Sequence, residues 1–127
     1  MSVLVADDDR ITGRVLEKQL RARGHDVLLV HGGAAAWDVL GSANPPLVAV
    51  LDWSMPGMTG PQLCQSVRAR SDAPFTYLVL LTGRDQAVDV TAGLAAGADD
   101  YVKKPFDIGD VLQRVDRGLQ IARERRR

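Results

Sequence analysis

Short apolar runs alternate with longer amphipathic stretches along the whole chain. Five runs of three to five residues carry mostly apolar side chains, a pattern typical of strands that are buried on both faces of a parallel sheet. We expect strands at residues 3–6, 27–30, 47–51, 77–81 and 100–102.

Between these runs, apolar residues recur at the spacing of an amphipathic helix. Asp9 is suited to cap the first helix, and Gly24 is suited to end it. We expect helices from residue 10 to just before residue 24, at 34–40, 61–70 and 85–96, and from 108 toward the C-terminus. This alternation predicts an α/β fold with helices on both faces of a five-stranded parallel sheet.

Composition supports one globular domain over residues 1–122. Apolar residues make up 46% of the 127 residues and charged residues 25%, which suits a well-developed core. The 16 basic and 16 acidic residues balance, so the basic excess of a nucleic-acid-binding domain is absent and no direct nucleic acid binding is expected. The basic segment at 123–127 is interpreted as a solvated tail or the start of a linker.

Three further features favour a cytoplasmic protein. No apolar run approaches the roughly 18 residues of a membrane span, so no membrane association is expected. Acids occur from Asp7 onward and leave no room for a signal peptide. The single cysteine, Cys64, excludes an internal disulfide and is expected to be a small apolar residue of a helix.

Polar side chains follow four of the five expected strands. Ligands of open parallel sheets bind outside the carboxyl ends of the strands, so these side chains are candidates for a site. They are Asp7, Asp8 and Asp9 after the first strand, Asp52 after the third, Thr82 after the fourth and Lys104 after the fifth.

These residue types indicate phosphoryl-transfer chemistry. Neighbouring carboxylates repel one another, and Mg²⁺ relieves such repulsion while binding carboxylate, water and phosphate oxygens. His25, His31 and Cys64 form no ligand-like cluster, which argues against zinc. A metal beside a carboxylate, an ammonium and a hydroxyl suits a carboxylate nucleophile that forms an acyl phosphate.

Four motifs in order resemble the response regulator receiver domain of bacterial two-component signalling (CheY-like). They are the acidic run at 3–9, the loop Leu-Asp-Trp-Ser-Met-Pro-Gly-Met-Thr-Gly at 51–60, Leu-Leu-Thr-Gly at 80–83, and Gly-Ala-Asp-Asp-Tyr-Val-Lys-Lys-Pro-Phe at 97–106. The resemblance implies a flavodoxin-like three-layer α/β/α fold with strand order 2-1-3-4-5 and five helices. That order places strands 1 and 3 side by side.

The resemblance also implies roles for individual residues. Asp52 would accept a phosphoryl group from a sensor histidine kinase or a histidine phosphotransfer protein, so the domain would be a regulatory phosphoacceptor and not an enzyme. The implied Mg²⁺ ligands are Asp7, Asp8, Asp52 and the backbone carbonyl of Ser54. Thr82 and Lys104 would contact the phosphoryl group, Tyr101 would be the switch aromatic, and Ser54 and Arg84 would tune dephosphorylation. Lys104-Pro105 would be a cis peptide.

Two other functions compete with this interpretation. A haloacid-dehalogenase-type phosphatase would use Asp7 as its nucleophile, although Ile11 stands where that family prefers Thr or Val. A degenerate receiver would dock partners without phosphorylation, but such domains usually lack an acid, the Thr or the Lys, and this chain has them all.

The sequence names neither the kinase nor the output, and three contexts stay open: a stand-alone regulator, a receiver cut from a longer protein, and a receiver attached to a kinase. An apolar stripe continues along the last helix at Leu112, Val115, Leu119 and Ala122 without a stop signal after Gly118. We therefore expect that helix to lead toward an output domain, with pairing of receivers on the helix 4–strand 5–helix 5 face. The stripe is too short to hold a coiled coil, so a monomer or weak phosphorylation-dependent dimer is expected.

Overall fold

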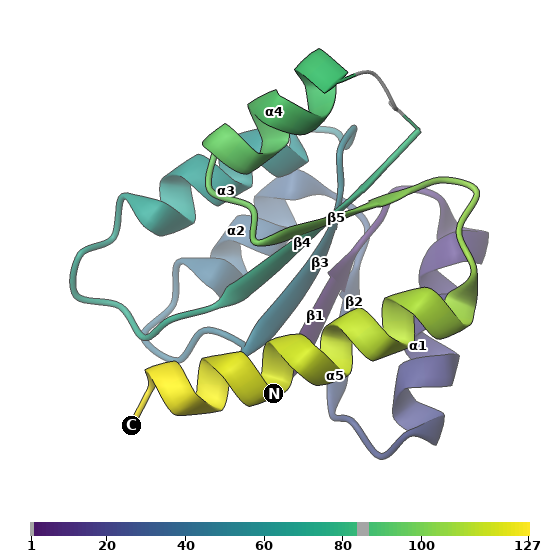
Figure 1. Ribbon diagram of the computed structural model, residues 1–127, viewed down its shortest axis with the longest axis horizontal. Helices are drawn as coiled ribbons and strands as arrows, with labels where there is room; N and C mark the ends of the chain where they lie inside the picture. The colour runs from purple at the N-terminus through teal and green to yellow at the C-terminus, as the bar shows by residue number, and fades with distance from the viewer. Residues whose placement is uncertain (1, 84–86) are drawn as a thin grey trace.

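Five parallel strands form one sheet in the order β2-β1-β3-β4-β5 in the computed structural model, which describes residues 2–83 and 87–127 (Figure 1). The strands are β1 (Val3–Ala6), β2 (Val27–Val30), β3 (Val48–Asp52), β4 (Tyr77–Thr82) and β5 (Asp100–Lys103). This order confirms the flavodoxin-like fold that the motifs implied.

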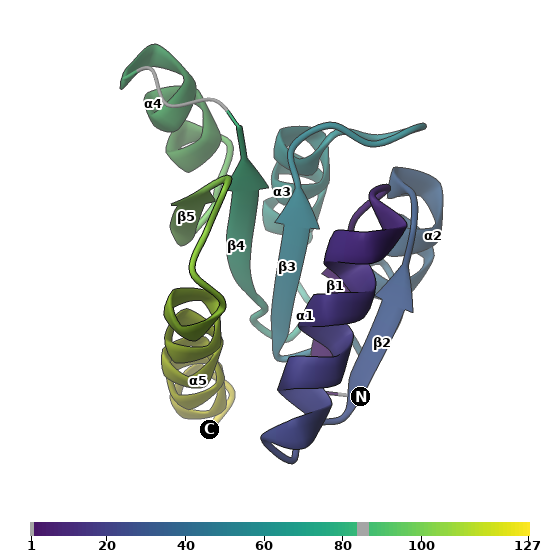
Figure 2. The ribbon, with the colours of Figure 1, turned by 90° about the vertical axis from the view of Figure 1, so that its right-hand side faces the viewer.

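Helices cover both faces of the sheet in the described part of the chain (Figure 2). They are α1 (Arg10–Ala22), α2 (Gly33–Leu40), α3 (Gly60–Arg68), α4 (Ala87–Ala95) and α5 (Ile108–Arg125). Side chains of α1 and α5 pack on one face, and side chains of α2 and α3 pack on the other. None of the described helices has the length and apolar character needed to cross a lipid bilayer.

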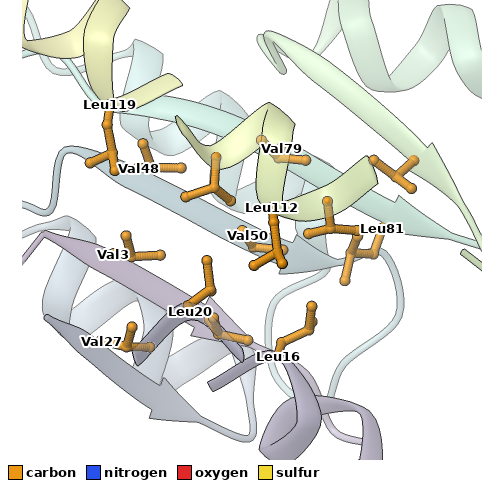
Figure 3. Close-up of a cluster of buried hydrophobic side chains, with 14 of the residues drawn as sticks. Val3, Leu16, Leu20, Val27, Val48, Val50, Val79, Leu81, Leu112 and Leu119 are labelled. Carbon is orange, nitrogen blue, oxygen red and sulfur yellow. The ribbon is translucent and has the colours of Figure 1, made fainter. Parts of the chain in front are cut away.

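The core consists of two apolar layers separated by the sheet. Along β1, Val3 and Val5 point toward α1 and α5, whereas Leu4 and Ala6 point toward α2 and α3. Figure 3 shows the first layer, in which Leu16 and other helix residues meet the strand side chains. Because both faces are covered, the central strands β1, β3 and β4 are buried along their whole length and almost entirely apolar, which is the pattern read from the sequence.

Local signals explain where several helices begin. The Asp9 side chain accepts a hydrogen bond from the backbone N–H of Ile11 at 3.1 Å, so the predicted cap of α1 is confirmed. At α3, Thr59 and Gln62 form a reciprocal capping box that starts the helix at Gly60, one residue earlier than expected.

Other boundaries differ from the predicted ones by a few residues. β3 is shifted by one residue, so Asp52 ends the strand and does not follow it. The described part of the fourth helix starts at Ala87, and the expected start at residues 85–86 lies outside the described residues. Cys64 lies on a helix, α3, as predicted, and is fully buried there.

The C-terminal basic segment is mostly helical. α5 continues to Arg125, and the Arg126 side chain is half-buried against backbone carbonyls, so it is not the solvated residue that the sequence suggested. Arg123, Arg125 and Arg127 are exposed as expected. The division of the chain at residue 122 stays a prediction.

Candidate functional site

The site lies where the two central strands, β1 and β3, end side by side. Ala6 of β1 pairs with Leu51 of β3, and the next residues are Asp7 and Asp52. Parallel strands point their carboxyl ends to the same edge, so this register places both acids together at the point where the strand order reverses.

Asp7, Asp8 and Asp52 form the acidic cluster at this edge. Each offers a carboxylate oxygen, and the three oxygens lie within 4.8 Å of one another. Asp7 is fully buried, Asp52 is 7% exposed, and Asp8 faces solvent. The donors are hard oxygens with neither His nor Cys among them, and one ligand position is open to solvent. This donor set fits Mg²⁺, which keeps several waters when it binds to proteins.

Lys104 reaches into the acidic cluster from the chain that follows β5. Its Nζ lies 3.2 Å from Asp7 Oδ2 and 3.3 Å from Asp52 Oδ1. The backbone N–H of Lys104 donates to the Thr82 carbonyl oxygen at 2.7 Å, and the Lys104-Pro105 peptide is cis, as the resemblance implied. The ammonium is therefore positioned by the neighbouring strand end and not only by the acids it contacts.

Burial and like charge dominate the electrostatics of the acidic cluster. Burial, and then the neighbouring Asp7 carboxylate, raise the pKa of Asp52 to about 7 from its usual 3.8, although Lys104 lowers it. Burial disfavours the Lys104 ammonium, but Asp52 and Asp7 outweigh this effect and raise the pKa of Lys104. When all groups are ionised, two negative charges remain in excess, which a divalent cation would balance.

Asp52→Asn is expected to stabilise the metal-free protein, and more at about pH 8 than at about pH 5. Because the pKa of folded Asp52 is about 7, above its ordinary 3.8, the folded protein keeps a proton that the unfolded chain releases. The free energy of unfolding therefore falls as the pH rises from 3.8 to about 7, the two pKa values of Asp52. At the higher pH, asparagine should add about 1 to 2 kcal/mol to the free energy of unfolding.

Urea unfolding in the presence of EDTA at both pH values measures this difference. Asp38→Asn, on the exposed face of α2, is the matched control and should change little at either pH. An equal gain in the free energy of unfolding for Asp52→Asn at both pH values would contradict the interpretation that the buried Asp52 carboxyl keeps its proton in the folded protein.

The remaining predicted site residues lie at the same edge or just beyond it. Thr82 ends β4 and is 1% exposed, and Tyr101 lies half-buried on the adjacent strand β5, paired with Leu80. Ser54 is exposed in the loop after β3. Arg84 lies outside the described residues.

Two supporting residues were missed by the sequence analysis. His31 Nδ1 donates to the Asp7 carbonyl oxygen at 3.1 Å, which ties the end of β2 to the acidic cluster. Gly33 donates its backbone N–H to the Pro56 carbonyl oxygen at 2.9 Å and lies against the backbone of Met58. The glycine pair at 32–33 was read only as a chain break, because no sequence pattern shows which backbone a glycine approaches.

A doubly wound α/β sheet with an acidic site at its switch point defines the class of this domain. The sequence model of the response regulator receiver domain matches residues 3–116, and the chain belongs to that family. Domains of this family serve as phosphoacceptor switches in two-component systems.

Individual relatives agree with the family assignment. The response regulator MprA of Mycobacterium avium (strain 104) is 39% identical over 115 residues, covering 91% of this chain and 49% of the relative. The receiver domain of the Francisella response regulator 1452 superposes with a TM-score of 0.87 at 30% identity, covering 94% of this chain and 97% of that one.

A third similarity concerns the fold alone. The receiver domain of sensor histidine kinase PA1611 from Pseudomonas aeruginosa superposes with a TM-score of 0.80 at 24% identity, covering 94% of this chain and 97% of that chain. The chain spans about half the length of the curated relatives it matches.

Proposed function

We propose that this chain is a phosphorylation-dependent switch in which Asp52 accepts the phosphoryl group. The observation that carries the proposal is the convergence of three carboxylates and the Lys104 ammonium on one point at the sheet edge, where Asp7 and Asp52 are buried. A carboxylate held beside an ammonium and a metal-binding cluster is suited to attack phosphorus and form an acyl phosphate.

Asp52 is a better nucleophile candidate than Asp7 because of what surrounds each carboxylate. Asp7 is fully buried, and its Oδ1 accepts the backbone N–H of Asp9 at 2.9 Å, so both of its oxygens are engaged by the protein. Asp52 retains some exposure and is contacted through Oδ1 by Lys104. Asp7 is accordingly suited to hold a metal, and this arrangement favours the receiver chemistry over a phosphatase with Asp7 as nucleophile.

Asp7, Asp8, Asp52 and the Ser54 carbonyl are proposed as the protein ligands of Mg²⁺. A bound Mg²⁺ neutralises charge on the phosphoryl oxygens. The chain's own residues orient the group: Lys104 offers an ammonium to one oxygen and Thr82 a hydroxyl to another. In the PA1611 receiver domain, which has this fold, a magnesium ion is coordinated in the active site cleft.

The signal is proposed to pass from Thr82 to Tyr101 and onward to the α4–β5–α5 face. Their positions on adjacent strands support this path, because Tyr101 of β5 pairs with Leu80 of β4, two residues before Thr82. A sensor histidine kinase or a phosphotransfer protein is the proposed donor. The greater length of the curated relatives supports an output domain or downstream partner as the recipient. Ser54 and Arg84 are proposed to set the lifetime of the phosphoryl group.

The direct test is labelling of the purified protein with acetyl phosphate and Mg²⁺. One acid-stable, base-labile phosphoryl group per chain is the expected product. A chain that stays unlabelled with this donor and with a histidine phosphotransfer donor would instead be a degenerate receiver that docks without phosphorylation.

Asp8→Ala is expected to weaken Mg²⁺ binding by about tenfold or more, because fewer carboxylates then face the ion. The same substitution should raise the stability of the metal-free protein, because it removes a like charge from the acidic cluster. Titration calorimetry with Mg²⁺ measures the first effect, and thermal unfolding in EDTA measures the second.

The matched control for this variant is Asp38→Ala, an exposed acid remote from the sheet edge. It should leave the Mg²⁺ affinity unchanged. Equal Mg²⁺ affinity in the wild type and Asp8→Ala would remove Asp8 from the ligand set.

A further inference from the structure

A groove of about 570 Å³ lies at the end of the sheet opposite the acidic cluster. Its walls come from the end of α3, the segment at 69–76 and the end of α5, which lie at the same end of the molecule (Figure 1). Four arginines line it: Arg68, Arg70, Arg125 and Arg126. We call this feature the arginine groove.

Backbone carbonyls hold three of these arginines in place. Arg68 donates to the carbonyl oxygens of Gly97 and Thr76 at 3.0 and 2.9 Å. Arg126 donates through Nε to the Phe75 carbonyl oxygen at 2.8 Å, and through one terminal nitrogen to the carbonyl oxygens of Pro46 and Pro45 at 2.9 and 3.1 Å. Arg70 donates to the carbonyl oxygen at the end of α2 at 2.6 Å. Anchored guanidinium groups lose little side-chain freedom when a ligand binds, so the groove is preorganised.

The charges of the arginine groove are unbalanced. Arg68 forms an ion pair with Asp99, but the other three arginines form no ion pair with any carboxylate among residues 2–83 and 87–127. Asp72 is the acid that lines the groove itself. With Asp99 and Asp72 counted against the four arginines, two positive charges remain in excess in the groove.

The surroundings of Phe75 select among anionic ligands. The guanidinium carbons of Arg68 and Arg125 lie 4.9 and 4.7 Å from the centre of its ring, so cations already cover the ring that a nucleobase would need for stacking. Val67 and Pro74 also line the groove, and their apolar atoms suit the side chains of a peptide.

We propose that the arginine groove binds an acidic peptide segment of a partner protein. Carboxylates of the segment engage the remaining donors of Arg70 and Arg125 in the bidentate geometry that guanidinium groups favour, and its apolar side chains contact Val67 and Pro74. This binding surface is independent of the acidic cluster, because it lies at the opposite end of the strands and uses none of its residues.

A fluorescein-labelled octapeptide of alternating glutamate and leucine is the probe for this surface. Its anisotropy should rise saturably with protein at about 150 mM salt, and a glutamine–leucine peptide should bind at least about tenfold more weakly. Arg125→Glu should weaken binding by about tenfold or more. Arg125 is exposed and its guanidinium group lies over the Phe75 ring, so this variant should keep the fold.

Arg123→Glu is the matched control. It makes the same charge change two residues earlier in α5, at an exposed position that does not line the groove. It should change the affinity less than about threefold, and Asp52→Asn should not change it. Equal losses for Arg123→Glu and Arg125→Glu would overturn the proposal, because binding would then follow overall charge.

Two other outcomes would also overturn the proposal. The first is tighter binding of a labelled octathymidylate than of the acidic peptide, which would identify a nucleic acid surface. The second is self-association of the chain in sedimentation experiments that is lost in Arg125→Glu and that excludes the peptide. The occupant of the groove would then be an acidic surface of a second copy of the chain.

Discussion

Asp52→Asn should abolish the labelling of this protein by acetyl phosphate in the presence of Mg²⁺, with a loss of at least about a hundredfold. The amide has no negative charge and a poor lone pair for attack on phosphorus, so it cannot form the acyl phosphate. Intact mass spectrometry with and without a brief base treatment reads the product directly. The result identifies the nucleophile, because the asparagine amide has almost the same volume as the Asp52 carboxyl and should leave the packing around it unchanged.

Two companion variants separate the competing mechanisms. Thr82→Ala should still be labelled on Asp52, but the nuclear magnetic resonance signals of Tyr101 should then respond less to beryllofluoride than in the wild type.

Asp7→Asn should lose Mg²⁺ affinity, because it removes a buried carboxylate of the acidic cluster. Labelling that survives Asp52→Asn and is lost in Asp7→Asn would instead identify a phosphatase-type nucleophile.

Gly33→Ala should destabilise the protein by about 2 to 4 kcal/mol, a large effect for a single methyl group. A Cβ at this position would lie 2.1 Å from the Met58 carbonyl oxygen and 2.5 Å from the Met58 nitrogen. These are backbone atoms and cannot rotate away as a side chain would. The start of α2 or the loop after β3 must therefore move, with loss of the hydrogen bond from Gly33 to Pro56.

The same variant should weaken Mg²⁺ binding, because the displaced loop also carries the Ser54 carbonyl. Urea unfolding and Mg²⁺ titration together measure both effects. Gly32→Ala is the matched control: its Cβ would meet the Pro56 carbonyl oxygen at 3.6 Å, an ordinary contact, so the loss should stay below about 1 kcal/mol. Similar losses at both positions would show that the close approach at Gly33 is not what limits stability.

Strands and helices were readable from the sequence because their signals are local. The apolar runs at β1 and β2 have the observed bounds. β1 is buried on both faces and is therefore apolar at every position. The Asp9 cap was readable for the same reason, because its partner lies only two residues away. The start of α3 was misplaced because the Thr59–Gln62 capping box was overlooked, although its spacing is visible in the sequence.

The candidate site was readable only in part. Motifs placed acids, a hydroxyl and a lysine at the ends of four of the five strands, and the resemblance to the receiver family supplied the strand order that brings β1 and β3 together. Apolar periodicity alone carries no information about which strands are neighbours. The family resemblance therefore contributed what pattern analysis could not.

Distances, burial and charge coupling were decided by the tertiary structure alone. The pKa of Asp52 rises to about 7 because its carboxyl is buried and Asp7 follows directly after the neighbouring strand, and both causes require the packed sheet. Arg126 contacts carbonyls about 50 to 80 residues earlier in the chain, so its sequence context marked it only as one more basic residue at a helix end. The sequence determined the elements and the chemistry at their ends, whereas the fold determined which of those groups share one electrostatic environment.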